Sequence, residues 1–417
     1  MRELFPHIGY KDGELYVEEV RVKEVAEKVG TPVYIYSRRA IEEAFLEFEE
    51  AFREVPHLTA FAVKANSNVH VLKLLFKLGA GADTVSVGEL FRALNAGAEP
   101  KKLLFAGVGK REDEIEFALE RGILMFNVES EGELKRIEKV ARRLSRKAPV
   151  AIRVNPEVDP KTHPYIATGL RSSKFGVDFE TALKLYRFAK NSTWLEPVGI
   201  HFHIGSQITE ISPFKEAALK VKELVLELKE QGIELEYFDA GGGLGISYEP
   251  YSKQTPAREL AKALVPIVKE LGLKLILEPG RRITGNGGVL VTELLYVKKT
   301  PERLFYVVDA GMNDLARPSL YQAYHHIEPV EEVNRETVRA SVVGPICEST
   351  DVFAKDRELP LLNEGELLTI FSAGAYGFTM ASNYNSRPRP PEVLVEGSSF
   401  RVIREREKLS DLTLREL

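Results

Sequence analysis

Between Thr59 and Glu278 the sequence alternates regularly between short apolar or β-branched runs and amphipathic stretches that have the apolar period of a helix. The eight runs are Thr59–Val63, Ala82–Val87, Leu103–Gly107, Leu124–Val128, Val150–Asn155, Val198–Ile204, Tyr237–Ala240 and Leu273–Glu278. The stretches between them include Asn68–Leu78, Glu89–Ala96, Glu112–Arg121, Ser130–Leu144, Phe179–Asn191, Pro213–Gln231 and Pro256–Leu271. Eight consecutive β-α units fit either a closed barrel or an open doubly wound sheet. The strand count, and the lack of a G-x-G-x-x-G turn after the first run, predict an α/β fold with a (β/α)8, TIM-like barrel.

The sequence after about Ile283 has a different texture, because β-rich runs follow one another through Gly, Pro and Asn turns without long helices. These runs are Val289–Lys299, Leu304–Asp309, Val338–Val343, Glu366–Phe371 and Val393–Val395. The pattern predicts an antiparallel β-sandwich or β-barrel domain, to which we also assign the strand Glu14–Val20. A strand-like run at Pro32–Tyr36 and a helix at Arg38–Arg53 lead into the barrel from outside. We therefore expect a barrel over residues 36–283 and a β domain built from residues 1–35 and 284–417.

Composition excludes several classes of function. The net charge of −5, without any block of five or six like charges, argues against a nucleic-acid or membrane-surface protein. The N-terminal segment lacks the apolar core of a signal peptide, and no apolar run approaches the length of a membrane span. The single cysteine, Cys347, excludes an intrachain disulfide. These features predict a cytoplasmic protein, in which Cys347 is either a buried inert thiol or a reactive one.

Polar residues stand at the ends of the predicted barrel strands, which is where such barrels carry their chemistry. They are Lys64, Asp83, Ser86, Asn127, Glu129, Arg153, Asn155, His203, Gly241–Gly243 and Glu278–Arg281. Lys64 is ordinarily a solvated strand cap, but a lysine buried at the barrel mouth would be a neutral amine able to form a Schiff base. The run Gly241–Gly243 is either a flexible turn or a cradle in which backbone N–H groups approach a phosphate closely.

Two further motifs carry charge or imidazole to the same edge. In Glu278-Pro-Gly-Arg281 a tight turn brings a carboxylate and a guanidinium together, either as a structural ion pair or as partners of a ligand. His201 and His203 lie on one face of a strand. Three interpretations are open for these histidines. They are ordinary core residues, or they bind zinc, which is weakly supported because no Cys pair or H-E-x-x-H motif accompanies them. In the third interpretation an imidazole stacks on the ring of an aromatic cofactor. A lysine, a glycine run, a carboxylate and an imidazole at one rim together describe a pyridoxal-phosphate site, and we expect no metal.

Six motifs, FAVKAN, HFHIGSQ, DAGGGLG, EPGR, PICESTD and GAYGF, occur in order over nearly the whole chain. Together they resemble the diaminopimelate decarboxylase family, whose pyridoxal-phosphate enzymes have the alanine-racemase fold (fold type III) and act as homodimers with shared active sites. The resemblance implies a carboxy-lyase (EC 4.1.1.20) that converts meso-2,6-diaminopimelate into L-lysine and CO₂, the last step of lysine biosynthesis. It also implies that the β domain contributes to the substrate site and to the dimer interface.

The resemblance implies roles for individual residues. Lys64 would form the Schiff base with the cofactor, His203 would stack on its ring, and Glu278 would pair with the pyridine nitrogen. The remaining cofactor contacts would be Asp83, Ser206, Gly241, Gly242, Gly243, Gly280, Arg281 and Tyr376. The substrate contacts would be Arg281, Arg317, Tyr321, Glu348 and Tyr376. Cys347 and Glu348 would reach the active site of the partner subunit, where Cys347 is a plausible acid for protonating Cα.

The types of the predicted substrate-binding residues are consistent with diaminopimelate, and the alternatives to this function stay open. The distal end of diaminopimelate needs a cation for its carboxylate and an anion for its ammonium group, which Arg317 and Glu348 supply. A sister decarboxylase of ornithine, arginine or carboxynorspermidine would share the lysine, glycine and EPGR motifs, although ornithine has no distal carboxylate to meet Arg317. A non-catalytic carrier of pyridoxal phosphate would be expected to lack the second domain, and a decarboxylase-like inhibitor would be expected to have lost Cys347 or Lys64.

Overall fold

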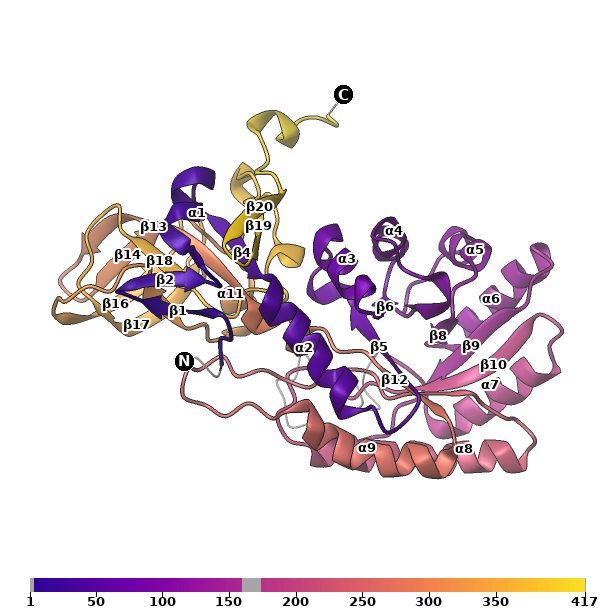
Figure 1. Ribbon diagram of the computed structural model, residues 1–417. Helices are drawn as coiled ribbons and strands as arrows, with labels where there is room; N and C mark the ends of the chain where they lie inside the picture. The colour runs from indigo at the N-terminus through magenta and orange to yellow at the C-terminus, as the bar shows by residue number, and fades with distance from the viewer. Residues whose placement is uncertain (1–3, 160–173, 417) are drawn as a thin grey trace. The chain divides into compact units, whose positions relative to one another are not determined.

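A computed structural model describes residues 4–159 and 174–416 of the chain (Figure 1). The described residues divide into two compact units. The barrel unit spans Ala44–Ile246 and Gln254–Arg282, and the β unit holds the remaining described residues. The helix α2 (Arg38–Ala51) runs along the chain from the β unit into the barrel unit.

The barrel unit is a closed barrel of eight parallel strands, in the order β10-β11-β12-β5-β6-β7-β8-β9. The predicted (β/α)8 barrel is therefore confirmed. The strands are β5 (His57–Ala62), β6 (Gly81–Thr84), β7 (Leu103–Phe105), β8 (Met125–Val128), β9 (Ala148–Arg153), β10 (Leu195–His201), β11 (Tyr237–Asp239) and β12 (Lys274–Leu277). The helices between them are α3 (Val69–Lys77), α4 (Val87–Asn95), α5 (Glu112–Arg121), α6 (Glu131–Arg143), α7 (Phe179–Asn191), α8 (Ser212–Glu230) and α9 (Ala257–Leu271).

Local sequence explains why the helices begin where they do. The side chains of Asn68, Ser86, Ser130 and Asp178 accept a hydrogen bond from the first turns of α3, α4, α6 and α7. At α6 the predicted start at Ser130 is confirmed. Ser130 and Glu133 have the spacing of a capping box, in which each side chain accepts from the other residue's backbone N–H, but only the Ser130 half of it is formed. Glu133 does not reach back to Ser130: its Oε2 accepts from the backbone N–H of Glu129 at 3.2 Å, and its Oε1 lies 2.6 Å from Nζ of Lys110.

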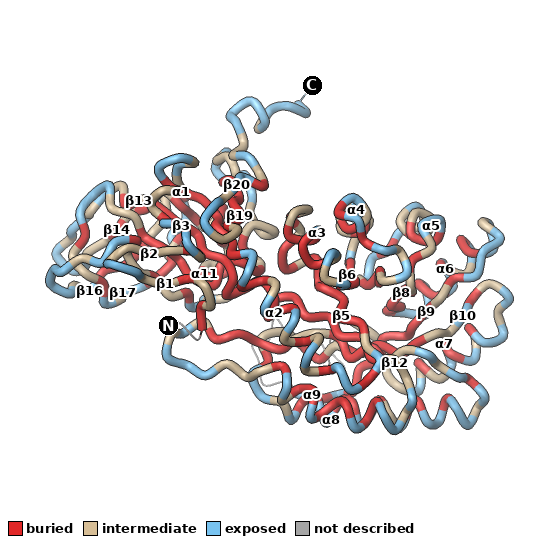
Figure 2. The backbone as a smooth tube through the Cα atoms, in the orientation of Figure 1, coloured by how far each residue is buried: buried red, intermediate tan, exposed pale blue. Residues whose placement is uncertain are grey.

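Apolar side chains fill the interior of the barrel, and the polar side chains of the site lie at one end of it. A buried cluster inside the strands contains Leu58, Ala60, Leu104, Met125, Ala151 and Ile276. Figure 2 shows the barrel strands largely buried, whereas the helices alternate between buried and exposed faces. This alternation reflects the amphipathic periods from which the helices were predicted.

The β unit contains a three-stranded sheet and a nine-stranded sheet. The small sheet is β1 (Ile8–Lys11), β2 (Glu14–Val17) and β3 (Val20–Arg21). The large sheet contains β4 (Val33–Ser37), β13 (Gly288–Lys299), β14 (Leu304–Val308), β15 (Ile327–Pro329), β16 (Thr337–Val343), β17 (Val352–Pro360), β18 (Leu367–Ile370), β19 (Glu392–Glu396) and β20 (Ser399–Arg404). Its longer helices are α1 (Val22–Val29) and α11 (Arg317–Tyr321), and α10 (Arg281–Thr284) links the units along the chain.

Strand pairing refines the expected antiparallel domain. Most neighbours are antiparallel, but β14 runs parallel to β16 and β4 runs parallel to β19, so the sheet is mixed. The expected strand Glu14–Val20 is two strands, β2 and β3, because Glu18 takes a left-handed φ of 52° and turns the chain. Valines and isoleucines from β4, β13 and β19 bury this sheet in a core with the N-terminal segment.

The unit boundaries differ from the predicted ones at two places. The barrel unit begins at Ala44 rather than residue 36, since β4 pairs with β13 and β19 and thereby belongs to the β unit. The segment Ser247–Lys253 also belongs to the β unit, although it lies within the predicted barrel range. Its Ser247 carbonyl accepts a hydrogen bond from Nδ2 of Asn286, and its Tyr248 packs beside Arg317.

Candidate active site

The barrel places a set of polar side chains at the carboxyl ends of its strands. Lys64 lies in a single 3-10 turn directly after β5, and Asp83 lies within the adjacent β6. Asn127, His201 and Asp239 lie in β8, β10 and β11, and Glu278 directly follows β12. Because all eight strands are parallel, their carboxyl ends meet at one rim, and the side chains named here are brought together.

Lys64 and Asp83 form an ion pair, with 2.5 Å between Nζ and Oδ2. The Asp83 residue is only 2% exposed, whereas the lysine side chain is 36% exposed. The other carboxylate oxygen of Asp83, Oδ1, is buried and has no hydrogen-bond partner among residues 4–159 and 174–416. Burial raises the pKa of Asp83, as does the nearby Glu278, while the positive charge of Lys64 opposes the shift.

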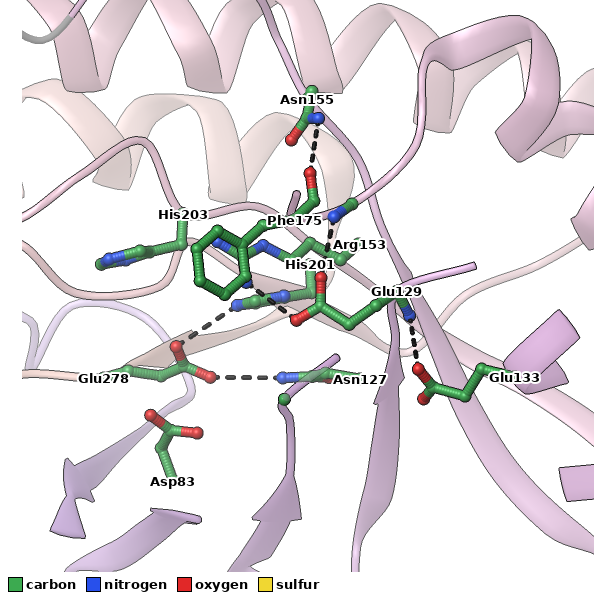
Figure 3. A network of polar contacts seen from close by, with 12 residues as sticks. Asp83, Asn127, Glu129, Glu133, Arg153, Asn155, Phe175, His201, His203 and Glu278 are labelled. Atoms are coloured by element: carbon green, nitrogen blue, oxygen red, sulfur yellow. Dashed lines mark hydrogen bonds and ion pairs between the residues drawn. The ribbon is translucent and has the colours of Figure 1, made fainter. Parts of the chain in front are cut away.

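Glu278 lies at the centre of a buried network with Asn127 and His201 (Figure 3). Asp239 belongs to the same network. Oε2 of Glu278 lies 3.3 Å from Nε2 of His201, and its Oε1 accepts a hydrogen bond from Nδ2 of Asn127 at 3.3 Å. The same Nδ2 also lies 3.3 Å from Oδ2 of Asp239. Asn127 therefore bridges the two carboxyl groups.

The two carboxyl groups in this network differ in how readily they ionise. Burial, followed by the neighbouring Glu278, raises the pKa of Asp239 well above its usual range. Burial would also raise the pKa of Glu278, but the contact with His201 and the positive charge of Lys64 outweigh it and hold that pKa well below its usual range. Within the network, Glu278 therefore ionises more readily than Asp239. The role of Asp239 was missed by the sequence reasoning, although its position at a strand end was a usable signal.

His201 and His203 do not act as a pair. His201 contacts Glu278, whereas Nδ1 of His203 accepts a hydrogen bond from the backbone N–H of Gly242 at 3.1 Å. Burial and the positive charges of Arg153 and Lys64 lower the pKa of His203 well below its usual range. His203 is therefore neutral, with its proton on Nε2. His201, Asp239 and Glu278 place one nitrogen and two oxygens within 4.8 Å of each other, and Nε2 of His201 lies 3.3 Å from Oε2 of Glu278.

The glycine run Gly241–Gly243 fits tightly between two loops, and no other residue could replace its members without displacing backbone. An added Cβ atom would lie 2.5 Å from the Phe202 carbonyl oxygen at Gly241, 2.1 Å from that of Glu278 at Gly242, and 2.3 Å from that of Gly205 at Gly243. The backbone N–H of Gly241 donates to Oδ1 of Asp239 at 2.9 Å. Gly241 and Gly242 thus direct their N–H groups at residues of the site itself.

The loop after β12 packs against the turn that carries Lys64. A Cβ atom at Gly280 would lie 3.0 Å from those of Ala62 and Ala65, and the Pro279 carbonyl accepts from the Ala62 N–H at 3.0 Å. Arg281, only 7% exposed, donates from Nη2 to Oγ of Ser206 at 3.1 Å. A hydroxyl, a guanidinium and a glycine-lined turn are the donor types that bind a phosphate.

A second polar network, which sequence reasoning did not identify as such, adjoins the first. Arg153 donates to Oε1 of Glu129 at 2.8 Å (Figure 3). Oε2 of Glu129 accepts from the backbone N–H of Gly176 at the same distance. The guanidinium of Arg153 also lies 4.6 Å from the ring centre of Phe175. This network ties β8 and β9 to the segment that begins at Lys174.

The β unit carries the remaining predicted site residues. Arg317 starts α11, is 5% exposed, and has its Nη1 3.0 Å from Nε2 of His325. Nδ1 of His325 lies 2.8 Å from the Phe371 carbonyl oxygen, so Nδ1 carries a proton and neutral Nε2 accepts from Arg317. The guanidinium also lies 4.5 Å from the ring centre of Tyr248. Arg317 is thus a charged group held on an aromatic face.

The other predicted residues of the β unit are more accessible. Tyr321 ends α11 and is partly exposed. Tyr376 takes a left-handed φ of 54°, which is uncommon for a bulky side chain and typical of functional loops. Cys347 and Glu348 are exposed in the turn between β16 and β17. The reactive interpretation of Cys347 is therefore favoured over the buried one.

Comparisons with known proteins bear on this arrangement. Residues 38–285 match the family described as pyridoxal-dependent decarboxylase, pyridoxal binding domain. The chain is 52% identical to diaminopimelate decarboxylase of Aquifex aeolicus over 407 residues, which cover 98% of this chain and 96% of that protein.

Two solved structures agree over nearly the whole chain. Diaminopimelate decarboxylase of Helicobacter pylori complexed with L-lysine has a TM-score of 0.92 and 47% identity, covering 94% of this chain and 98% of that chain. The enzyme of M. jannaschii in co-complex with L-lysine has a TM-score of 0.95 and 42% identity, covering 99% and 98%. The chain belongs to the diaminopimelate decarboxylase family of pyridoxal-phosphate-dependent decarboxylases.

Proposed function

We propose that the protein decarboxylates meso-2,6-diaminopimelate to L-lysine and CO₂, with pyridoxal phosphate held at the rim of its barrel. The observation that carries the proposal is the buried Glu278, which contacts Asn127 and His201 at the same rim as the Lys64–Asp83 ion pair. Family membership, at 52% identity to one diaminopimelate decarboxylase, supports the same assignment.

The residues of the rim fit the cofactor. Lys64 would hold its aldehyde carbon, and the buried, ionised Glu278 would face the protonated ring nitrogen. The neutral imidazole of His203 would lie against the ring, because an uncharged aromatic group suits a stacking contact. When bound, pyridoxal phosphate supplies an electron sink for the negative charge that remains on Cα after CO₂ leaves.

The phosphate would lie against the glycine-lined loops. Ser206 and Arg281 provide a hydroxyl and a guanidinium, and the glycines let backbone approach closely. We assign Gly241–Gly243 and Gly280 to this contact. Asp83 would keep Lys64 oriented, and its buried Oδ1 offers a further acceptor toward the site.

Residues of the β unit would bind the distal end of the substrate. Arg317 is positively charged, and His325 and the ring of Tyr248 orient its guanidinium. It suits the distal carboxylate, assisted by Tyr321 and Arg281. Glu348 suits the distal ammonium group, and Tyr376 would contact both substrate and cofactor.

Cys347 would supply the proton that Cα gains after CO₂ leaves, since an ordinary thiol, with a pKa of about 8.5, carries a proton at neutral pH and can donate it. Cys347 and Glu348 are exposed on the isolated chain, as expected for residues that complete the site of a second subunit. We therefore propose a homodimer with shared active sites. We also propose a cytoplasmic location, which agrees with a single cysteine and with the finding that no helix within residues 4–159 and 174–416 is long and apolar enough to cross a membrane.

A substrate panel tests the proposed function. Purified holoenzyme is incubated separately with meso-diaminopimelate, ornithine, arginine, lysine and carboxynorspermidine, and released CO₂ and amine products are quantified. We expect release from diaminopimelate with one lysine formed per CO₂, and at least about a hundredfold lower kcat/KM with ornithine, which has no carboxylate for Arg317. Preferential turnover of another amine would identify a sister decarboxylase, and no turnover of any would indicate a cofactor-binding protein without this activity.

A further inference from the structure

The turn that carries Cys347 and Glu348 has a rigid base beneath an exposed tip. The carboxylate of Asp351 accepts hydrogen bonds from the backbone N–H groups of Ile346 at 2.8 Å and Met312 at 2.7 Å. The Asp351 carbonyl also accepts from the N–H of Gly344 at 3.1 Å. These contacts close the turn at its base but do not reach the two functional side chains.

Two neighbouring residues of a second segment contact the tip itself. The backbone N–H of Cys347 donates to Oδ1 of Asn385 at 2.8 Å, and the hydroxyl of Tyr384 donates to Oε1 of Glu348. The hydrogen bond to Glu348 raises the pKa of Tyr384, so the hydroxyl keeps its proton and remains a donor. One side chain thus fixes the backbone of the cysteine, and its neighbour fixes the carboxylate of the glutamate.

The second segment is itself anchored on the β unit. The Ser382 N–H donates to the Asn313 carbonyl at 2.8 Å, and Nη2 of Arg387 donates to that of Asp309 at 2.9 Å. Nδ2 of Asn383 donates to Glu407 at 2.7 Å. Asn385 has φ of 56° and ψ of 27°, a left-handed conformation that asparagine tolerates better than most residues. Contacts on both sides of Tyr384 and Asn385 therefore hold these residues in place.

We infer that Tyr384 and Asn385 are positioning residues of the reaction, with separate tasks. Asn385 holds the turn so that the Cys347 thiol is presented for proton transfer, and Tyr384 orients Glu348 for the distal ammonium group. The inference rests on the proposed function of Cys347 and Glu348. Because the tasks differ, their loss affects different kinetic constants: kcat for Asn385 and KM for Tyr384. Contacts that merely stabilised the turn would not produce this division.

The test of Asn385 uses substitutions that preserve its backbone. Asn385→Gly removes the acceptor and retains the left-handed conformation, whereas Asn385→Asp retains an acceptor for the Cys347 N–H. Ser386→Gly is the matched control, since Ser386 is exposed and also left-handed, with φ of 54°. We expect Asn385→Gly to lower kcat about tenfold with KM within twofold, and Asn385→Asp to restore kcat to within about threefold. Ser386→Gly should leave both constants unchanged.

A thiol measurement checks the same contact without turnover. Cys347 is the only cysteine of the chain, so alkylation of the holoenzyme by iodoacetamide reports this residue alone. The negative charge that Asn385→Asp places beside the turn should raise the pKa of the thiol and move the pH profile of alkylation upward by roughly 0.5 units. An unchanged profile, together with wild-type kcat in Asn385→Gly, would overturn the role of Asn385.

Tyr384→Phe tests the second task by removing only the hydroxyl. We expect KM for diaminopimelate to rise about fivefold with kcat within twofold, because Glu348 would no longer be held in one orientation. Tyr296→Phe is the control, since Tyr296 is 62% exposed on β13.

Two outcomes would contradict parts of the account. If kcat and KM change equally in both positioning variants, in proportion to a lowered Tm, the two residues have a purely structural role and the inference is overturned. If Cys347→Ser keeps wild-type kcat, the proposed function of Cys347 fails instead; if only Asn385→Gly does, the positioning role alone fails.

Discussion

The Nζ atom of Lys64 lies 2.5 Å from Oδ2 of Asp83, where Lys64 stands in the turn directly after β5 and Asp83 lies in the adjacent strand β6. Asp83 is almost fully buried, and Lys64 is its hydrogen-bond donor and charge partner. The lysine proposed to hold the cofactor is therefore oriented by a buried carboxylate rather than enclosed in an apolar pocket. Its side chain remains 36% exposed at the rim.

Replacement of Lys64 should separate folding from cofactor attachment. In Lys64→Ala we expect the visible absorbance of the bound cofactor to disappear and kcat/KM to fall at least about a thousandfold, because no amine remains to hold the aldehyde. Lys73→Ala on the exposed face of α3 is the control and should retain both properties. An intact absorbance band in Lys64→Ala would contradict the assignment.

Gly242→Ala should disrupt the cofactor site through its backbone. The added Cβ atom would lie 2.1 Å from the Glu278 carbonyl oxygen, so the loop carrying Glu278 must shift. We expect cofactor affinity, measured by titration of the apoenzyme with pyridoxal phosphate, to fall at least about tenfold. Gly132→Ala in α6, where a Cβ atom meets nothing within 4 Å, is the control and should be stabilised by roughly 0.5–1 kcal/mol. Equal affinities in the two variants would show that the close packing is irrelevant.

Cys347 can be tested both as an acid and as a shared residue. Cys347→Ala should lower kcat about a hundredfold while cofactor absorbance is retained, because only the proton donor is lost. Mixing this variant with Lys64→Ala under conditions that allow subunit exchange creates hybrids in which one of two shared sites is intact. Recovered activity should approach about a quarter of the wild-type value, since about half the dimers are hybrids. No recovery, with exchange confirmed, would place each site within one subunit.

Asp314 should make stability depend on pH. Burial raises its pKa to about 7, partly offset by the backbone N–H of Gly311. Between pH 4 and 7 the folded chain keeps a proton that the unfolded chain releases, so the free energy of unfolding falls as pH rises through this window. The proton held by Asp314 contributes at most about 4 kcal/mol to the free energy of unfolding at the acid end of this window.

The matched measurement compares Tm at pH 5 and pH 8. Asp314→Asn cannot ionise, so we expect its Tm to fall less between these values than that of the wild type. Asp12→Asn, in an exposed left-handed turn, should follow the wild type. If Asp314→Asn and the wild type lose the same Tm, the buried proton of Asp314 does not contribute.

The barrel could be predicted because each of its β-α units is local in sequence. The apolar run of β5 and the cap at Asn68 both act within a few residues, and the parallel order then follows from repetition. The place of β4 could not be predicted in this way. Its partners β13 and β19 lie hundreds of residues away along the chain, so no local pattern indicates them.

In the candidate site too, features set by local sequence could be predicted, and features set by distant residues could not. Lys64, Glu278 and the glycine run were found because their residue types are unusual at strand ends. The bridging role of Asn127 and the raised pKa of Asp239 depend on distances across the barrel between β8, β11 and the loop after β12. The contacts of Tyr384 and Asn385 with the turn at Cys347 join exposed segments that have no periodicity, and nothing in their sequence pointed to the turn.

The central claim is that pyridoxal phosphate is attached to Lys64. Reduction of the holoenzyme with borohydride, followed by digestion and mass spectrometry, identifies the lysine that carries the pyridoxyl group. We predict a single modified peptide containing Lys64, with the modification lost when the enzyme is stripped of cofactor before reduction. A pyridoxyl group on any other lysine, with Lys64 unmodified, would contradict the account.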